Sequence, residues 1–307
     1  MHHLLTRYLF VLFALSSLLG EKIAAAEWVT RPVIEMREAP DRQSEIASQA
    51  RCGEEITVIE RRGEWTLIET VVDGYRGWVH DEGFYAVMPP KEESIWVFVN
   101  RPAAHVYGEE DTTHGPLCTL PFETPLRILN LPGDSSSRWI TVILPDGRTA
   151  SIQRGDITFS LGCKDFDEVA ELSLRFLGLP YTWGGRSSFG YDCSGFVQML
   201  YRQLGIAIPR DARDQMTWEG FKEIPLERMK RGDLVFFGPS STHIVHVGMA
   251  LDSERVIHPH ITDLRPYLRI DSFAVENPFQ WIGHPYVAVR RLILTPEAAA
   301  GPQQRHR

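Results

Sequence analysis

The chain has 307 residues, with 40 acidic and 32 basic side chains and a formal net charge of −8 at pH 7. This acidic balance argues against nucleic acid as a partner, because nucleic-acid-binding domains carry basic surfaces. With 43% hydrophobic and 23% charged residues, the composition is globular and excludes wholesale disorder. The length suffices for two or three small domains.

The first 26 residues have the pattern of a secretory signal peptide. A weakly basic start precedes an apolar run at 8–19, and small residues at 24–26 precede Glu27. The run is too short for a comfortable membrane span, and no cysteine for a lipid anchor stands directly after it. We therefore expect export to the periplasm or cell envelope, without stable membrane insertion. A buried N-terminal helix is the alternative.

Residues 27–90 alternate short β-like runs with turn signals. The runs lie at 33–36, 55–59, 65–68 and 77–79. Asp73-Gly74 marks a tight hairpin turn before the last of them. Strands this short and this closely spaced predict a small all-β barrel.

Residues 91–162 repeat this plan in diverged form. The runs at 126–129 and 139–142 match the second and third runs of the first segment, and Asp146-Gly147 matches its turn. We therefore predict two tandem β modules, joined by the Pro- and Glu-rich stretch 89–93.

Residues 163–295 have a mixed pattern. Asp165 and Glu168 form a capping box that predicts a helix to about Leu177, and a second helix is expected directly after Asp192. Four β-like runs follow, at 234–237, 244–251, 256–258 and 286–294. Helices followed by antiparallel strands predict an α+β domain. The polar residues 296–307 are expected to form a disordered tail.

Cys193 stands at the predicted start of the second helix, with Asp192 as its N-cap. Backbone N–H groups and the positive end of the helix dipole favour a thiolate there, and the thiolate is the nucleophilic form. Apolar residues at helical spacing then bury the helix and fix the thiol at a cleft. The alternative is a small buried cysteine without chemistry.

Two histidines downstream can supply the base. If Asp252 to Glu254 form a three-residue hairpin loop, His246 lies opposite His260, and His258 is its diagonal neighbour on the same face. His246 would then take the thiol proton, and His258 would orient it. A two-residue loop would place the two histidines on opposite faces. His243 and His260 are interpreted as structural.

A zinc site made by Cys193, His246 and His258 is the other interpretation of the same residues. It is weakened by the absence of close-spaced ligand pairs such as CxxC or HExxH, so no metal or other cofactor is expected. In an oxidising compartment, Cys52, Cys118 and Cys163 could form one disulfide bridge, and their pairing stays open. Cys193 should stay unpaired.

Five motifs in order resemble the NlpC/P60 cysteine peptidases, which cut peptidoglycan peptides. The resemblance covers about residues 165–295 and implies a papain-like α+β catalytic domain. The motifs are Tyr181-Thr182-Trp183-Gly184-Gly185, Asp192-Cys193-Ser194-Gly195-Phe196-Val197, Pro209-Arg210-Asp211-Ala212, Gly232-Asp233-Leu234-Val235-Phe236-Phe237 and His246-Val247-Gly248.

The resemblance implies Cys193 as nucleophile, His246 as base and His258 as third polar residue. It places the Tyr181 hydroxyl beside the nucleophile, near the oxyanion. Further positions that it implies at the substrate cleft are Asp192, Ser194, Arg210 and Asp211. The structural alternatives are helix capping for Asp192 and Ser194, and a surface ion pair between Arg210 and Asp211.

The two N-terminal segments resemble bacterial SH3 (SH3b) modules, the second more weakly. In γ-D-glutamyl-diamino-acid endopeptidases of this family, the first SH3b module closes one end of the cleft. The resemblance implies that Tyr75 helps to receive the substrate's free amino terminus, and that Glu38 adds a negative charge. The alternatives are a packed turn aromatic for Tyr75 and a solvated loop charge for Glu38.

Together these features predict an exported cysteine endopeptidase. Its substrates would be peptidoglycan stem peptides with a free N-terminal L-Ala, cut between γ-D-glutamate and a diamino acid such as meso-diaminopimelate. One alternative is a catalytically idle scaffold that binds peptidoglycan. Another is an amidase or acyltransferase on the same fold.

Overall fold

The computed structural model describes residues 27–80, 84–86, 94–130, 136–162, 164–261, 265–273 and 283–293. The expected signal peptide (1–26), the linker 89–93, Cys163 and the tail 296–307 lie outside the described residues. None of the described helices is long and apolar enough to cross a membrane.

The first module is a seven-stranded antiparallel sheet with the order β3-β2-β6-β5-β4-β1-β7. Its hairpin turn lies where predicted, with the Gly74 N–H donating to the Thr70 carbonyl at 2.8 Å and Gly74 at φ +67°. Its core is formed by alternate side chains such as Met36, Ile56 and Ile68, all fully buried. The strands are β1 (Glu27–Val29), β2 (Val33–Arg37), β3 (Ile46–Arg51), β4 (Glu55–Arg62), β5 (Trp65–Thr70), β6 (Arg76–His80) and β7 (Phe84–Ala86).

The second module repeats this topology strand for strand, with the order β10-β9-β13-β12-β11-β8-β14. The predicted repeat is therefore present in three dimensions, despite the diverged sequence. Cys52, from the first module, packs into the core of the second. The strands are β8 (Trp96–Val99), β9 (Ala103–Tyr107), β10 (Cys118–Pro121), β11 (Pro125–Asn130), β12 (Trp139–Ile143), β13 (Thr149–Gln153) and β14 (Ile157–Thr158), with the 3-10 turn η1 (Arg154–Asp156) before the last.

The third unit is α+β, as predicted, with a six-stranded antiparallel sheet ordered β17-β22-β18-β19-β20-β21. Helix α2 packs against β19 and β20 and buries Phe196, Val197 and Leu200 completely. The helices are α1 (Phe166–Leu174), α2 (Cys193–Gln203), α3 (Ala212–Thr217) and the 3-10 turn η2 (Leu226–Arg228). The strands are β15 (Arg186–Ser187), β16 (Gly190–Tyr191), β17 (Phe221–Ile224), β18 (Leu234–Phe237), β19 (His246–Ala250), β20 (Arg255–His260), β21 (Tyr267–Ser272) and β22 (Tyr286–Leu292).

Several expected bounds differ from the structure by a few residues, and local contacts explain two of them. Helix α1 ends at Leu174 rather than at about Leu177, because Arg175 already forms the C-cap with its N–H on Leu172 and Ser173 carbonyls. Strand β19 begins at His246 rather than at Ile244, because Ser240 to His243 form a local turn ahead of it. Strand β21 pairs with β20 along its whole length and is not among the predicted strands.

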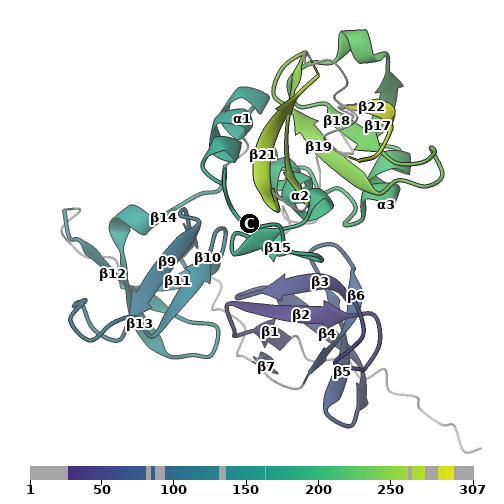
Figure 1. Ribbon diagram of the computed structural model, residues 1–307. Coiled ribbons are helices and arrows are strands. Elements are labelled where there is room, and N and C mark those ends of the chain that lie inside the picture. Colours follow the sequence, from purple (N-terminus) through teal and green to yellow (C-terminus); the bar gives the residue numbers. More distant parts are fainter. Residues whose placement is uncertain are drawn as a thin grey trace, which may run out of the picture.

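The three units meet around β15, which lies between them in Figure 1. Arg186 is fully buried there and pairs with Glu54 of the first module at 2.7 Å. Glu54 also pairs with Arg51 at 2.6 Å, and Arg51 reaches Glu123 of the second module at 2.7 Å. Glu123 pairs in turn with Arg202 of α2 at 2.5 Å. We call these five side chains the ion hub; they join all three units through buried charge.

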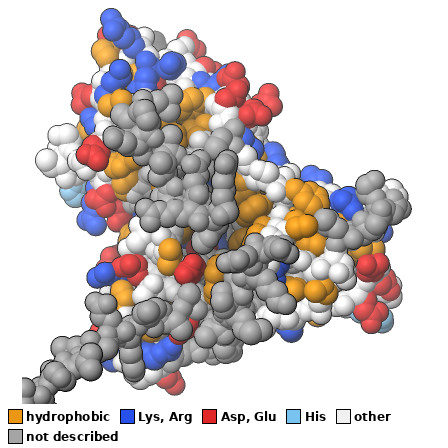
Figure 2. Space-filling view, turned by 180° about the vertical axis from the view of Figure 1, so that it is seen from behind, with side chains coloured by type: hydrophobic (Ala, Val, Ile, Leu, Met, Phe, Trp, Pro, Cys, Tyr) orange, Lys and Arg blue, Asp and Glu red, His pale blue; other side chains and the backbone are white. Residues whose placement is uncertain are grey.

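The described residues on one face of the molecule carry charges of both signs. Seen from behind, acidic and basic side chains are both spread over the three lobes, with apolar side chains between them (Figure 2). On this face, the net charge of −8 therefore does not form a single acidic field.

Candidate active site

Cys193 is the first residue of α2 and only 7% exposed. The predicted N-cap is confirmed, since the Asp192 carboxylate accepts from the Gly195 N–H at 2.7 Å. Only glycine fits at position 195, because an added Cβ would lie 2.3 Å from the Gly185 carbonyl oxygen. The thiol lies beside the backbone N–H groups of Ser194 and Val247, which favour its anion.

The expected thiolate is not the resting state of this site. Burial is the largest influence on Cys193, and with the Asp192 carboxylate it raises the thiol pKa to about 12. The backbone N–H groups and Arg210 oppose this shift without overcoming it. The expected thiolate rests on the helix N-terminus alone. Burial in the surrounding fold destabilises the anion more than the helix N-terminus stabilises it. Cys193 is therefore a neutral thiol before reaction.

The predicted three-residue hairpin loop is confirmed. Met249 pairs with Ile257, and the Leu251 N–H donates to the Arg255 carbonyl at 2.8 Å, so Asp252 to Glu254 form the loop. This register brings the two histidines together: His246 Nε2 lies 2.6 Å from His258 Nδ1.

The histidine pair is deeply buried, with His246 4% and His258 0% exposed. Burial first, and then the nearby His258, holds the pKa of His246 well below 6.5. Burial also lowers the pKa of His258. Both rings are therefore neutral at neutral pH, and His246 can accept a proton. His260 lies edge-on to His246, with ring centroids 4.7 Å apart.

A further residue completes this arrangement, Asp271 on β21. Its Oδ2 lies 3.1 Å from His258 Nε2 and accepts from Arg269 Nε at 2.9 Å. Burial alone would raise the Asp271 pKa, but His258 and Arg269 hold it at about 2. Asp271 is not among the predicted site residues, although the alternation of apolar and polar residues along 267–272 indicates a strand.

Tyr181 lies near the thiol, as the resemblance implied. Burial raises the pKa of its hydroxyl, and the next causes are Cys193 and Asp192, so these groups are neighbours. The Tyr181 N–H donates to the Pro266 carbonyl at 2.9 Å, which anchors this residue to the start of β21. A protonated hydroxyl beside Cys193 can donate to an oxygen that becomes negative there.

Arg210 is buried at the centre of a network, not on the surface. It is 4% exposed and donates to Asp192 at 2.6 Å and to the Ser194 hydroxyl at 2.8 Å. Its Nε donates to the Ser48 hydroxyl of the first module at 3.1 Å. The alternative of a surface ion pair with Asp211 is therefore wrong. Arg210 instead joins the N-cap of α2 to the neighbouring module.

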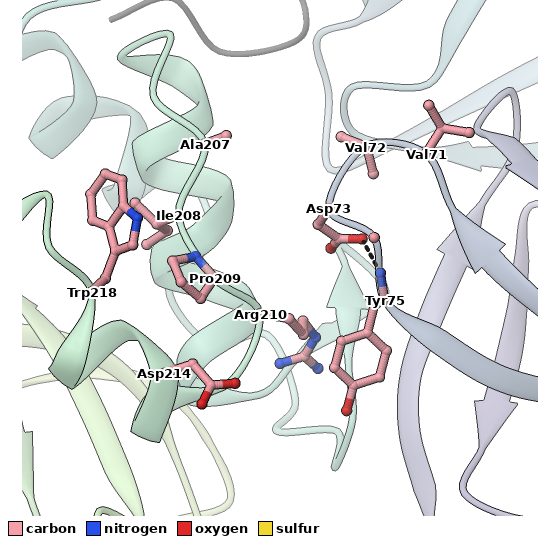
Figure 3. A pocket seen from close by; sticks show the side chains of 11 residues that line it. Val71, Val72, Asp73, Tyr75, Ala207, Ile208, Pro209, Arg210, Asp214 and Trp218 are labelled. Atoms are coloured by element: carbon pink, nitrogen blue, oxygen red, sulfur yellow. Dashed lines mark hydrogen bonds between the residues drawn. The ribbon is translucent and has the colours of Figure 1, made fainter. Parts of the chain in front are cut away.

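Tyr75 reaches the catalytic unit from the first module. Its hydroxyl lies 3.5 Å from the Asp211 carboxylate, and burial raises the Tyr75 pKa to about 12. Burial also raises the pKa of Asp211. In Figure 3, Tyr75 stands beside Arg210 at the edge of a cavity of about 520 Å³, with Trp218 on its other side. Glu38 is exposed between β2 and β3 and is not among the residues that line this cavity.

Gly248 allows His258 to approach His246. A Cβ at Gly248 would lie 2.5 Å from Val256 Cγ1 and 3.0 Å from His258 Cβ. Gly248→Ala should therefore displace His258 and lower kcat about 100-fold, since a shift of roughly 1 Å in a catalytic group has this effect. Steady-state kinetics check this, with Gly155→Ala as control, since Gly155 is exposed and an added Cβ there would meet nothing within 4 Å. A kcat within twofold of wild type would contradict it.

Comparisons with known proteins agree with this architecture. The NlpC/P60 family matches residues 178–272, and a bacterial dipeptidyl-peptidase SH3 domain matches residues 36–84. A γ-D-glutamyl-L-lysine dipeptidyl-peptidase of Bacillus cereus is 32% identical over 235 residues, which cover 70% of this chain and 67% of the relative. The Bacillus subtilis protein of the same name is 29% identical over 259 residues, covering 78% and 81%.

Solved structures show the same fold. An NlpC/P60 family protein from Bacillus cereus has a TM-score of 0.74 and 23% identity, over 88% of this chain and all of that one. An NlpC/P60 endopeptidase from Photobacterium damselae has a TM-score of 0.62 and 16% identity, over 88% and 73%. The chain therefore belongs to the NlpC/P60 family of peptidases, with an SH3-type N-terminal domain ahead of the catalytic fold.

Proposed function

We propose that this enzyme is an exported cysteine endopeptidase that cuts peptidoglycan stem peptides between γ-D-glutamate and the following diamino acid. The observation that carries the proposal is the thiol at the start of α2, beside the strand that bears the hydrogen-bonded His246–His258 pair. The names of the two Bacillus relatives support the γ-D-glutamyl bond. The signal-peptide pattern of residues 1–26 supports export.

The reaction begins from a neutral thiol and a neutral imidazole. His246 takes the Cys193 proton as the sulfur attacks the γ-carbonyl of D-glutamate, so the buried thiolate never has to persist alone. The Tyr181 hydroxyl and the N–H at the start of α2 stabilise the oxyanion. His246 then protonates the leaving amine of the diamino acid. Water, activated by the same imidazole, hydrolyses the thioester and releases L-Ala-γ-D-Glu.

Specificity for a free amino terminus would come from the boundary with the first module. Asp211 offers a carboxylate for an ammonium group, and the Tyr75 hydroxyl beside it narrows the space. A lactyl group and glycan attached to L-alanine would remove that positive charge and add bulk. The preferred substrates are therefore peptide fragments released from the wall rather than stems still attached to glycan.

The test compares L-Ala-γ-D-Glu-meso-diaminopimelate with the same peptide acetylated on its amine, and with the L-lysine analogue. Acetylation should lower kcat/KM about 10- to 100-fold, the cost of one charge-assisted hydrogen bond. Asp211→Asn should reduce this preference, whereas Asp111→Asn, exposed in the second module, should keep it. Products are identified by mass. Binding without cleavage, or release of another fragment, would overturn the proposed function; equal rates on both peptides would overturn only the amine preference.

A further inference from the structure

Asp271 ends a line of hydrogen bonds that runs inward through two imidazoles. Its Oδ2 lies 3.1 Å from His258 Nε2, and His258 Nδ1 lies 2.6 Å from His246 Nε2. The remaining nitrogen of His246, Nδ1, is left for chemistry at the cleft. The two imidazoles share one hydrogen bond, and His258 uses its other nitrogen for Asp271. The position of the proton on His258 therefore determines the position of the proton on His246.

Asp271, at the outer end of the line, determines which atom donates in each of these hydrogen bonds. An ionised carboxylate can only accept hydrogen bonds. His258 Nε2 must therefore carry a proton and donate a hydrogen bond to Asp271. A neutral His258 then has a lone pair on Nδ1, which accepts from the Nε2–H of His246. A neutral His246 protonated on Nε2 has its lone pair on Nδ1. This is the tautomer that can take a proton from a thiol.

We propose that Asp271 is a positioning residue that fixes the tautomer of His246 through His258. This inference rests on the proposed function, in which His246 is the base. Among the described contacts, Asp271 pairs with His258 and Arg269 and not with Cys193. It determines which nitrogen of His246 is basic, from two hydrogen bonds away.

The groups around the line keep it in this state. Arg269 donates to Asp271 from its Nε, and its Nη2 lies 3.3 Å from His260 Nδ1. The guanidinium keeps the carboxylate ionised. On the other side, Arg269, His260 and His284 act on His246, and each disfavours its protonated form. After burial, these charges are what opposes a positive charge on His246, whereas Asp271 favours one on His258.

The decisive test compares Asp271→Leu with Asp271→Asn, which both keep the size of the side chain and remove its charge. In Asp271→Asn the amide oxygen can take the place of Oδ2, accept from both Arg269 Nε and His258 Nε2, and keep the His246 tautomer. Asp271→Leu offers no acceptor, so the His258 proton can move to Nδ1 and the His246 proton to Nδ1, where it blocks the base. We expect Asp271→Leu to lower kcat about 10²-fold with little change in KM, and Asp271→Asn to lose less activity.

A merely structural role, or a role of the charge alone, predicts equal kcat in the two variants, because they have the same size and lack the same charge. Asp271→Asn being as impaired as Asp271→Leu, or more so, would therefore overturn the proposal. Asp167→Asn, an exposed carboxylate on α1, is the matched control and should retain wild-type kcat.

Nitrogen-15 NMR of the histidine rings tests the same claim without turnover. His246 should be protonated on Nε2 in the wild type and in Asp271→Asn, and on Nδ1 in Asp271→Leu. An unchanged His246 tautomer in Asp271→Leu would refute the proposal. This measurement needs no substrate. It therefore tests the tautomer of His246 even if the proposed peptidase reaction is not observed.

Discussion

Replacing Cys193 with alanine is expected to lower hydrolysis of L-Ala-γ-D-Glu-meso-diaminopimelate by about 10⁴-fold or more, as when other covalent nucleophiles are removed. Acyl transfer to the enzyme needs this sulfur, and no described side chain lies in an equivalent position at the start of α2. The measurement is dipeptide release, followed by mass spectrometry. The thermal midpoint should change little, because the sulfur is small and contributes little packing.

The matched control is Cys118→Ala, which changes a half-buried thiol in the second module and should retain full activity. Cys193→Ala should also bind the peptide with an affinity close to that of wild type. Retained cleavage by Cys193→Ala would refute the nucleophile assignment. Loss of activity in both variants would indicate that the assay reports folding instead.

Local sequence features predicted the reacting residues well. The Asp192 cap, the loop from Asp252 to Glu254 and the meeting of His246 with His258 each depend on residues within one helix or one hairpin. At that range, chain geometry fixes the result: alternation along a strand and a loop of known length determine which side chains share a face.

The features that could not be predicted from the sequence depend on contacts between distant segments. Asp271 meets His258 only because β21 pairs with β20, and the register across the intervening connection is not encoded in a short loop. Arg210 reaches Ser48 across a module boundary. The neutral state of Cys193 likewise comes from burial by the whole domain. Spacing within a motif carries no information about any of these.

The ion hub makes the three units depend on one another, since Glu54 pairs with both Arg186 of the catalytic unit and Arg51 of its own module. Glu54→Ala would leave both guanidinium groups buried without that carboxylate. Breaking a buried pair from one side costs about 3–5 kcal/mol, because the remaining charges stay desolvated. The free energy of unfolding of this variant should fall by that amount at pH 7, measured by urea denaturation. The control is Glu60→Ala, an exposed partner of Arg62, which should cost about 0–1 kcal/mol.

The same hub predicts a specific dependence of stability on pH. Burial alone would raise the pKa of Glu54 and Glu123, but the paired arginines lower both to about 2 from an ordinary value of 4.5. Because the folded-state pKa is depressed, this contribution is complete above pH 4.5 and is lost as the pH falls towards 2. The stability difference between wild type and Glu54→Ala should therefore be constant from pH 5 to 7 and shrink below pH 4.5. A difference under 1 kcal/mol at pH 7, or one that grows in acid, would contradict the hub's role in joining the three units.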